Sequence, residues 1–346
     1  MKILVIQQKM IGDVLSSSII CENIKQWNSN IKIDFIANRH TLPVIENNPY
    51  IDEIIIFEDY FRNTKMSFLD FLINHNKKKY DIIIDAYGKI ESILITIFSR
   101  GKIKIGYKKW YTKLVYSILI EREIHKPKSG IQLSIINRLK LLEPIIKKNI
   151  NKKLKPKIYL KNDRKKNYDF LSIKKENLLI MISAFGSSEQ KSYPTDKMVI
   201  LLNYLVKMHS VKLILNYMPK QNKEIINLLK KINLQTKEAI IVNKTPKSLK
   251  EYILTVSDCN AIVGNEGGAI NIAKALDIPS FSIFSPQIDP DAWCSKSPKD
   301  VSVHVKDFNN QFKGFKMKKS EIKRLYESFD FNYFQKDLSN FINRLH

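Results

Sequence analysis

Short apolar runs alternate with longer polar or amphipathic stretches over the first half of the chain. The runs lie at residues 3–6, 31–37, 54–57 and 82–84, and all are rich in isoleucine. Runs of this length and composition are typical of strands that are buried on both faces of a sheet. Helix-like or loop segments separate them, which predicts a parallel sheet with crossover helices. Residues 131–146 repeat apolar side chains at spacings of three and four, which predicts an amphipathic helix.

The alternation restarts after a lysine-rich stretch, Lys147–Lys166, that is typical of a solvated linker. Strands are expected at residues 178–182, 211–215, 239–242, 261–263 and 280–284, with helices at 197–208, 223–232, 248–256 and 270–276. The tail at 321–346 has a helical period, and we expect it to pack back on the first domain. The pattern therefore predicts an α/β protein with two doubly wound, Rossmann-like domains, at 1–160 and 161–320.

Composition and charge narrow the class of protein. The 346 residues are 44% hydrophobic and 27% charged, which is typical of a globular protein, and no signal peptide or membrane-spanning stretch is expected. Cys21, Cys259 and Cys294 are too isolated for a disulfide framework or a zinc site, which fits a reducing cytosol. A net charge of +24 is compatible with nucleic acid, an anionic membrane surface or phosphorylated substrates, although a composition crowded with Lys, Ile and Asn explains part of it.

The first candidate for chemistry follows the first strand, at Met10-Ile11-Gly12-Asp13-Val14-Leu15. Gly12 is expected to permit a tight turn, and Asp13 lies where a helix begins and its N–H groups are unpaired. In open parallel sheets, ligands bind outside the carboxyl ends of the strands, where the strand order reverses. Asp13 is therefore either a helix cap or a catalytic base.

A second candidate is the segment from Val263 to Pro279, in which a strand is followed by a glycine loop and then a helix. Gly267 and Gly268 allow backbone N–H groups to approach a phosphate, and the helix N-terminus adds partial positive charge. Glu266 could accept hydrogen bonds from sugar hydroxyls. The alternative is a tight turn with a capping acid.

A third candidate, residues 183–194, also follows a strand. Ser187 and Ser188 offer hydroxyls to diphosphate oxygens, and Lys191 offers a mobile positive charge to a leaving phosphate. A glycine-serine loop before a lysine is also plain loop chemistry, so this segment alone is not specific.

The sequence lacks several common motifs for cofactor and metal binding. It has neither the G-x-G-x-x-G dinucleotide pattern nor a G-K-[ST] phosphate loop, and its histidines never pair at metal-ligand spacing. Asp289-Pro290-Asp291 resembles an Asp-x-Asp metal motif, but a polar surface loop is the preferred interpretation. We expect no cofactor and no metal.

Taken together, the motifs resemble those of the ADP-heptose:lipopolysaccharide heptosyltransferase family, glycosyltransferase family 9. The resemblance covers residues 1–290 and keeps the order of the family's motifs. The matching segments are Ile11-Gly12-Asp13, Tyr80-Asp81-Ile82, Ser92, Ile105-Gly106-Tyr107, Lys191-Ser192-Tyr193-Pro194 and Asn265–Leu276. Four positions depart from the family pattern: Glu266 replaces an aspartate, Gly267 a hydroxyl residue, Asn271 a histidine and Tyr193 a tryptophan.

The resemblance implies two facing Rossmann-like domains, the GT-B arrangement, and sugar transfer that inverts the anomeric centre without a metal. Asp13 would then be the general base, and Lys191 would stabilise the departing diphosphate together with the amides of Gly267 and Gly268. The donor-binding residues implied are Gly12, Ser187, Ser188, Glu266, Gly267, Gly268 and Asn271. Because the departures fall on the donor side, ADP-heptose is the donor by family default, and another nucleotide sugar remains an alternative.

The family's acceptors are anionic lipid-linked sugars, which implies a cytoplasmic protein that contacts the inner membrane face without inserting. Lys108, Lys109 and Trp110, in the basic and aromatic segment Arg100–Lys113, are candidates for the acceptor side or the membrane surface. A solvated loop with its aromatics packed inward is the alternative. A non-catalytic nucleotide-sugar-binding protein also remains open, whereas a nucleic-acid binder explains the charge but not the glycine loops.

Overall fold

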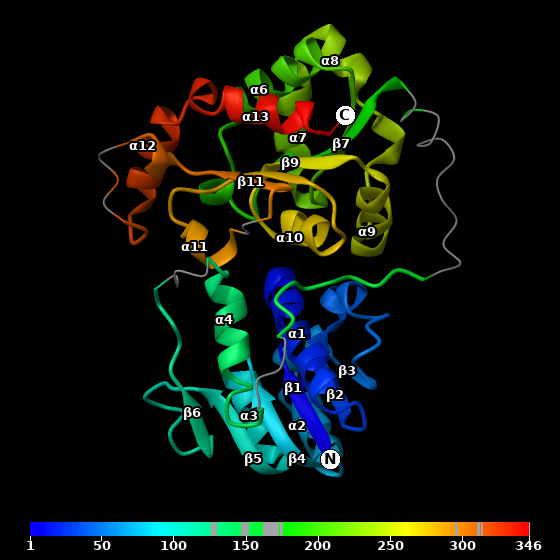
Figure 1. The fold of residues 1–346 in the computed structure, drawn as a ribbon, viewed down its shortest axis with the longest axis vertical. Helices are drawn as coiled ribbons and strands as arrows, with labels where there is room; N and C mark the ends of the chain where they lie inside the picture. Colours follow the sequence, from blue (N-terminus) through cyan, green and yellow to red (C-terminus); the bar gives the residue numbers. More distant parts are fainter. Residues whose placement is uncertain are drawn as a thin grey trace. The chain divides into compact units, whose positions relative to one another are not determined.

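The computed structural model describes residues 1–125, 130–146, 152–161, 173, 176–294, 297–309, 312 and 314–345. Two compact units form, Met1–Asn162 and Asp163–His346, and each contains one sheet (Figure 1). Much of the lysine-rich stretch expected as a linker lies outside the described residues. Among the described helices, none is both long enough and apolar enough to cross a bilayer.

Unit 1 has a six-stranded parallel sheet in the order β3-β2-β1-β4-β5-β6. Its strands are β1 (Lys2–Ile6), β2 (Lys32–Asn38), β3 (Glu53–Phe57), β4 (Lys79–Asp85), β5 (Arg100–Tyr107) and β6 (Ile118–Ile120). Its helices are α1 (Ile11–Trp27), η1 (Arg39–Val44), η2 (Asp59–Arg62), α2 (Lys65–Asn76), α3 (Ile90–Phe98) and α4 (Leu133–Lys140). This is the strand order of a dinucleotide-type Rossmann sheet, which reverses between β1 and β4.

The helices of unit 1 cover both faces of its sheet. The α1 and α4 helices pack against each other (Figure 1), and the Tyr107 hydroxyl donates to the carbonyl of Asn137 in α4. The α2 and α3 helices also pack side by side, and Leu72 and Ile95 bury their side chains with Leu4 and Ile83 of the sheet. Because strand side chains alternate between faces, Lys104, which reaches the carbonyl of Ile97 in α3, lies opposite Tyr107.

Unit 2 has a five-stranded parallel sheet in the order β11-β10-β9-β7-β8, which reverses between β7 and β9. Its strands are β7 (Leu178–Ser183), β8 (Val211–Asn216), β9 (Ala261–Asn265), β10 (Ser280–Ile283) and β11 (Asp300–Val303). Its helices are η3 (Glu189–Lys191), α6 (Thr195–Met208), η4 (Pro219–Gln221), α7 (Asn222–Lys231), α8 (Leu234–Ala239), η5 (Val242–Lys244), α9 (Leu249–Asp258), α10 (Gly268–Ala275), α11 (Pro290–Trp293), η6 (Val305–Asp307), α12 (Lys319–Ser328), η7 (Phe331–Tyr333) and α13 (Gln335–Asn343).

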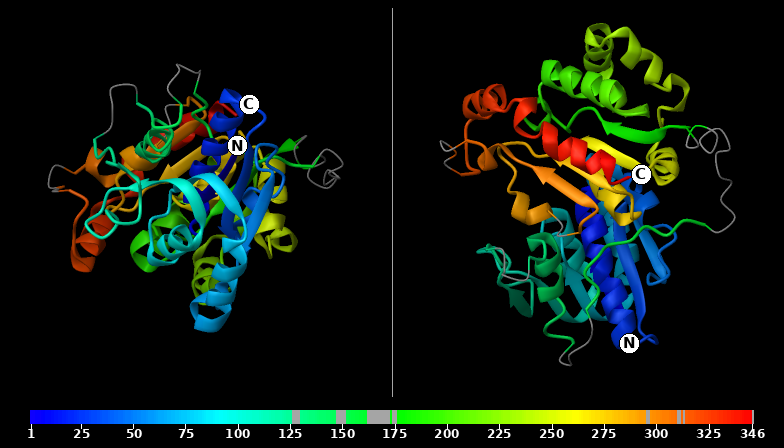
Figure 2. Two further views of the ribbon diagram at one scale, coloured as in Figure 1. Left: turned by 90° about the horizontal axis from the view of Figure 1, so that it is seen from below. Right: turned by 45° about the horizontal axis from the view of Figure 1, so that its top comes forward.

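The C-terminal segment is part of the core of unit 2, and its packing back on the first domain stays a prediction. Phe329, Phe334 and Phe341 are buried in one cluster with Phe281 of β10 and with residues of the other strands. Figure 2 shows α13, in red, against the second sheet. The apolar side chains of this segment therefore help to build the core of unit 2.

Two expected elements differ from the structure. Residues 239–242 do not form a strand, because α8 continues to Ala239 and only an isolated bridge joins Ile240 to Leu213. The helix expected at 131–146 ends at Lys140. Pro144 has no N–H to donate to the carbonyl of Lys140, so the helix cannot continue and the chain proceeds as turns.

Candidate active site

The candidate site of unit 1 lies at the reversal of strand order, where the loop after β1 meets the loop after β4. Met10 makes the turn into α1 with a φ of 66°, a conformation that costs free energy for a residue with a side chain. The expectation that Gly12 makes this turn is therefore wrong, since Gly12 lies in the first turn of α1. Asp13 follows it, with 31% of its side chain exposed.

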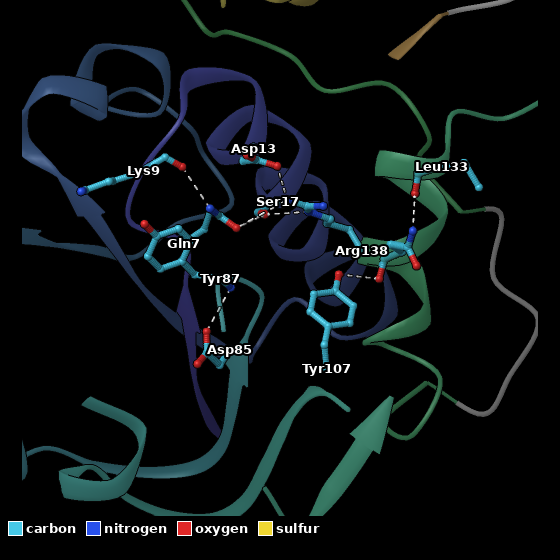
Figure 3. A network of polar contacts seen from close by, with 10 residues as sticks. Gln7, Lys9, Asp13, Ser17, Asp85, Tyr87, Tyr107, Leu133 and Arg138 are labelled. Atoms are coloured by element: carbon cyan, nitrogen blue, oxygen red, sulfur yellow. Dashed lines mark hydrogen bonds and ion pairs between the residues drawn. The ribbon is translucent and has the colours of Figure 1, made fainter. Parts of the chain in front are cut away.

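Asp13 does not cap α1, because the helix has no side-chain cap hydrogen bond. Instead Arg138 of α4 donates from Nη2 to Asp13 Oδ1 at 2.7 Å. The same guanidinium donates from Nε to Ser17 Oγ at 3.1 Å and approaches Gln7 Oε1 at 3.5 Å, as Figure 3 shows. Arg138 is buried and Gln7 is fully enclosed, so these contacts hold Asp13 at one place on the carboxyl edge of the sheet.

A second carboxylate, Asp85, lies at the end of β4, on the other side of the point where the strand order reverses. It is completely buried and accepts hydrogen bonds from the Tyr116 hydroxyl at 2.6 Å and from the amides of Tyr87 and Gly88. Burial raises the pKa of Asp85, while the Tyr116 hydroxyl and the two amides oppose that rise. With its oxygens already engaged, Asp85 fixes the loop after β4 and is less available for chemistry than Asp13.

The three residues proposed for the acceptor side or the membrane have different surroundings in the structure. Lys108 forms an ion pair with Glu121, and Lys109 donates from Nζ to the carbonyl of Gly88 at 2.6 Å. Trp110 is 86% exposed, whereas Tyr107 is buried. Lys109 therefore lies at the carboxyl edge of the sheet, and only Trp110 of the three projects freely into solvent.

In unit 2 the two candidate loops lie side by side, because they follow the neighbouring strands β7 and β9. The Asn265 side chain is completely buried and joins them: its Nδ2 donates to the carbonyls of Ser183 and Ala184, and its Oδ1 accepts from the Tyr193 amide at 2.6 Å. Gly264 has a φ of 134°, and a Cβ there would lie 2.3 Å from the Ser183 carbonyl oxygen. The close approach of these strand ends therefore requires glycine.

The first loop is also held from other sides. The Gly186 amide donates to Ser192 Oγ at 3.0 Å, and the Gly186 carbonyl accepts from Gln221 Nε2 at 2.8 Å. Tyr193 is buried and donates its hydroxyl to the Phe329 carbonyl. Ser187 and Ser188 are exposed at the tip, and Lys191 is partly exposed at the end of η3. The loop is thus fixed at its base while its hydroxyls and its lysine stay accessible.

Glu266 is the acidic side chain of the second loop. Burial raises the pKa of Glu266, while the positive charges of Lys274 and Lys191 oppose that rise. Lys191 and Glu266, which come from different loops, are therefore close enough to interact electrostatically. The space beside Gly267 is open, because a Cβ there would meet nothing within 4 Å. Gly268 begins α10, and Asn271 is partly buried in its first turn.

The arrangement in unit 2 suits a phosphate group. The N-terminus of an eight-residue helix, α10, opens beside an uncovered glycine and a nearby lysine. Asp289, by contrast, uses its Oδ1 to accept from the Asp291 amide and caps α11, which supports a loop role for that Asp-x-Asp segment. Within the described residues, no three His, Cys, Asp or Glu side chains are grouped as metal ligands.

Comparison with known proteins agrees with this geometry. The sequence profile of glycosyltransferase family 9 (heptosyltransferase) matches residues 74–323, well over half of the chain. The chain belongs to glycosyltransferase family 9.

Relatives of this glycosyltransferase match most of its length. Lipopolysaccharide heptosyltransferase 1 of Campylobacter coli is 23% identical over 300 residues, which are 82% of this chain and 84% of the relative. The glycosyltransferase family 9 structure from Veillonella parvula has a TM-score of 0.71 and 14% identity, covering 94% of this chain and 96% of that one. E. coli heptosyltransferase WaaC with ADP-2-deoxy-2-fluoro heptose has a TM-score of 0.65 and 17% identity, covering 88% and 93%. The GT-B fold of two Rossmann-like domains is thereby confirmed.

Three residues that organise the glycosyltransferase site were missed in the sequence. Arg138 lies far from Asp13 along the chain, and its apolar neighbours on α4 carry no sign of an ion pair. Asn265 stands out in the sequence only as part of a family motif, although an amide after a buried strand and before a glycine pair can bridge strand ends. Asp85 could have been found, because it is an acid that directly follows the isoleucine run of β4.

Proposed function

We propose that this glycosyltransferase moves a sugar from a nucleotide sugar to a hydroxyl of a glycan, with inversion and without a metal. The donor proposed is ADP-heptose and the acceptor a lipopolysaccharide-type glycan. The Campylobacter coli relative, named lipopolysaccharide heptosyltransferase 1, and the E. coli structure with an ADP-heptose analogue support this choice. The geometry that carries the proposal is the Asp13 carboxylate, which is partly exposed at the carboxyl edge of β1 and is not used as a helix cap.

In the proposed reaction, the acceptor oxygen attacks the anomeric carbon of the donor and forms the new C–O bond. Asp13 takes the proton from that oxygen, a role worth typically 10²–10⁴-fold in rate. The bond from the anomeric carbon to the diphosphate oxygen breaks, and its electron pair leaves with the diphosphate. Lys191 and the amides of Gly267 and Gly268 stabilise this charge, which is the largest that develops in the transition state.

The remaining proposed donor contacts come from Gly12, Ser187, Ser188, Glu266 and Asn271. Because a partly buried Glu266 is flanked by two lysines, it can accept from sugar hydroxyls while the lysines limit the cost of its charge. This position is the one at which the sugar would be chosen. A nucleotide sugar other than ADP-heptose is the second candidate, favoured by the replacements at Glu266, Gly267 and Asn271.

The acceptor proposed is an anionic, lipid-linked glycan at the cytoplasmic face of the inner membrane. Lys109 supports an acceptor role, because its Nζ lies at the carbonyl of Gly88, on the same sheet edge as Asp13. Neither nucleic acid nor a cofactor is part of the proposed reaction. A non-catalytic binder of nucleotide sugars would need no exposed base at Asp13.

The test has two stages. Thermal unfolding is first measured with ADP-, UDP- and GDP-sugars, since a ligand at 100 times its dissociation constant adds about 2.7 kcal/mol of stability. Stabilisation by ADP-heptose above the UDP- and GDP-sugars is expected. Transfer is then followed as release of the nucleoside diphosphate on adding acceptor, with and without EDTA. Strict dependence on Mg²⁺ or Mn²⁺ would contradict the mechanism, and donor binding without any release would favour the non-catalytic alternative.

A further inference from the structure

The α2 and α3 helices present apolar side chains to solvent on the face that points away from the sheet. On α2 these are Met66, Leu69 and Ile73, and on α3 they are Ile90, Ile97 and Phe98, with Leu94 partly exposed between them. Spacings of three, four and seven place each set along one stripe of its helix. Exposure is largest at the first residue of each stripe, where Met66 is 68% exposed and Ile90 is 74% exposed.

The two stripes lie on neighbouring helices. The α2 and α3 helices contact each other on the same face of the unit 1 sheet, and their inner side chains, such as Leu72 and Ile95, are already buried in the core. Apart from Leu94, which packs against this core, the side chains of the outer stripes lie outside that cluster. Exposed apolar side chains gathered on neighbouring helices usually mark an interaction site.

Exposed cations and aromatic rings neighbour these apolar side chains along the chain, and one exposed acid, Asp70, lies within the α2 stripe. The loop after β5 follows on the same face of the sheet, because Tyr116 packs against Gly106 and reaches Asp85 beside the start of α3. That loop carries Trp110, Tyr111 and Leu114 into solvent. The exposed cations nearest to the apolar side chains in sequence are Lys65, Lys77, Lys89, Arg100 and Lys113.

We propose that the surface formed by α2, α3 and the 110–114 loop docks on an anionic lipid bilayer. Apolar side chains would enter the headgroup boundary, Trp110 and Tyr111 would lie at the interface, and the flanking cations would contact lipid phosphates. This extends the proposed peripheral location, for which the sequence indicated only Arg100–Lys113. Within that segment Lys102 and Lys108 are already paired, with Asp81 and Glu121.

Charge selects the bilayer over a second copy of the chain. With a net charge of +24, two chains brought together through a face flanked by lysines would repel each other. An anionic bilayer has the complementary sign, and each cation near it contributes enough to change binding about fivefold. Apolar contact and charge therefore favour the same occupant.

The experiment is co-sedimentation of the full chain with phosphatidylcholine vesicles that either contain or lack phosphatidylglycerol. We expect binding to the anionic vesicles that weakens as salt is raised. The double variant Met66→Ser/Ile97→Ser should lower the partition coefficient on the order of tenfold. Lys65→Gln/Lys89→Gln should lower it by a similar factor on anionic vesicles and leave binding to neutral vesicles unchanged.

Matched controls come from unit 2, where Ile226 and Leu234 are exposed on α7 and α8 and Lys223 and Lys237 are exposed cations. Ile226→Ser/Leu234→Ser and Lys223→Gln/Lys237→Gln should bind vesicles as the unchanged protein does. Equal losses in these controls would overturn the proposal, as would absence of binding at low salt or equal binding to neutral vesicles. Light scattering that shows a dimer dispersed by Met66→Ser/Ile97→Ser would assign the surface to a second copy instead.

The outcome is independent of the proposed chemistry, because sedimentation needs neither donor nor turnover. Donor binding by each variant, measured by thermal shift, separates a lost docking surface from a protein that no longer folds. Vesicle binding with no transfer would overturn the proposed reaction alone, and transfer to a lipid-free acceptor without vesicle binding would overturn the docking surface alone.

Discussion

Arg138 and Asp13 are joined by a 2.7 Å ion pair although 125 positions separate them in the chain. The arginine is 7% exposed and the aspartate 31%, so the pair presents its acidic member to the carboxyl edge of the sheet. Arg138 also bonds Ser17, one turn further along α1 from Asp13. The candidate base is therefore oriented by a residue of another helix.

Replacing Asp13 by asparagine should lower turnover by at least ~10² while donor binding changes by no more than a few-fold. The amide keeps the size of the side chain but cannot take the proton from the acceptor. Single-turnover kinetics and donor titration measure the two effects separately. Turnover close to that of the unchanged enzyme would remove Asp13 from the mechanism.

Replacing Arg138 by lysine should lower kcat roughly tenfold or more, with little effect on donor affinity. A lysine keeps the positive charge, but its single head cannot contact Asp13 and Ser17 with the geometry of a planar guanidinium. The measurement is kcat and KM together with the melting temperature. A fall in melting temperature with unchanged kcat would show that Arg138 serves stability only.

Replacing Lys191 by alanine should weaken binding of the nucleoside diphosphate product, because a charge-assisted contact worth about 1.5–3 kcal/mol is removed. Binding is measured by calorimetry with ADP. Lys230→Ala, which removes an exposed lysine of α7, is the matched control and should bind ADP normally. Equal affinities in both variants would exclude Lys191 from the donor site.

Acid should destabilise unit 1 through His75. This side chain is buried and stacked between Phe71 and Tyr80, and burial, helped by the nearby Lys78, lowers the pKa of His75 to about 4. An unfolded histidine has a pKa near 6.5, so between these values the unfolded state binds more protons and stability falls as the pH falls. The loss should reach roughly 3 kcal/mol by pH 4, at about 1.4 kcal/mol per pH unit.

A phenylalanine at position 75 fits the same stack and cannot be protonated. The urea midpoint of His75→Phe should therefore fall less between pH 7.5 and pH 4.5 than that of the unchanged protein. His125, which is exposed, provides the control: His125→Gln should keep the original acid sensitivity. Identical pH dependence in all three proteins would show that other groups cause the acid loss.

Much of the fold could be predicted because its strands are short, fully apolar runs. The runs at 3–6 and 178–182 became β1 and β7, with ends that differ by one residue. The β5 strand was missed because Arg100, Lys102 and Lys104 interrupt its apolar pattern on the face toward α3. The β6 strand pairs only with Ile105–Tyr107, so the part of β5 that carries these cations has no neighbouring strand on that side and tolerates them.

The site was predicted as separate motifs, but its construction was not. The sequence placed Asp13, Lys191 and Glu266 after strands, where parallel sheets bind ligands. It did not show that Asn265 bridges two strand ends, or that Met10 rather than Gly12 makes the turn before α1. Those features depend on contacts between segments far apart in the chain, which local periodicity does not record.

The burial of the C-terminal segment in unit 2 also sets an order of events during synthesis. Unit 1 has all of its strands once Ile120 has been made, whereas the core of unit 2 lacks Phe334, Phe341 and Ile342 until the last part of the chain is made. The Tyr193 hydroxyl likewise has no acceptor before Phe329 exists. On the ribosome, the half with the candidate base can therefore fold first. The glycine loops are fixed only later, so an interrupted synthesis would yield a folded first domain beside an incomplete donor domain.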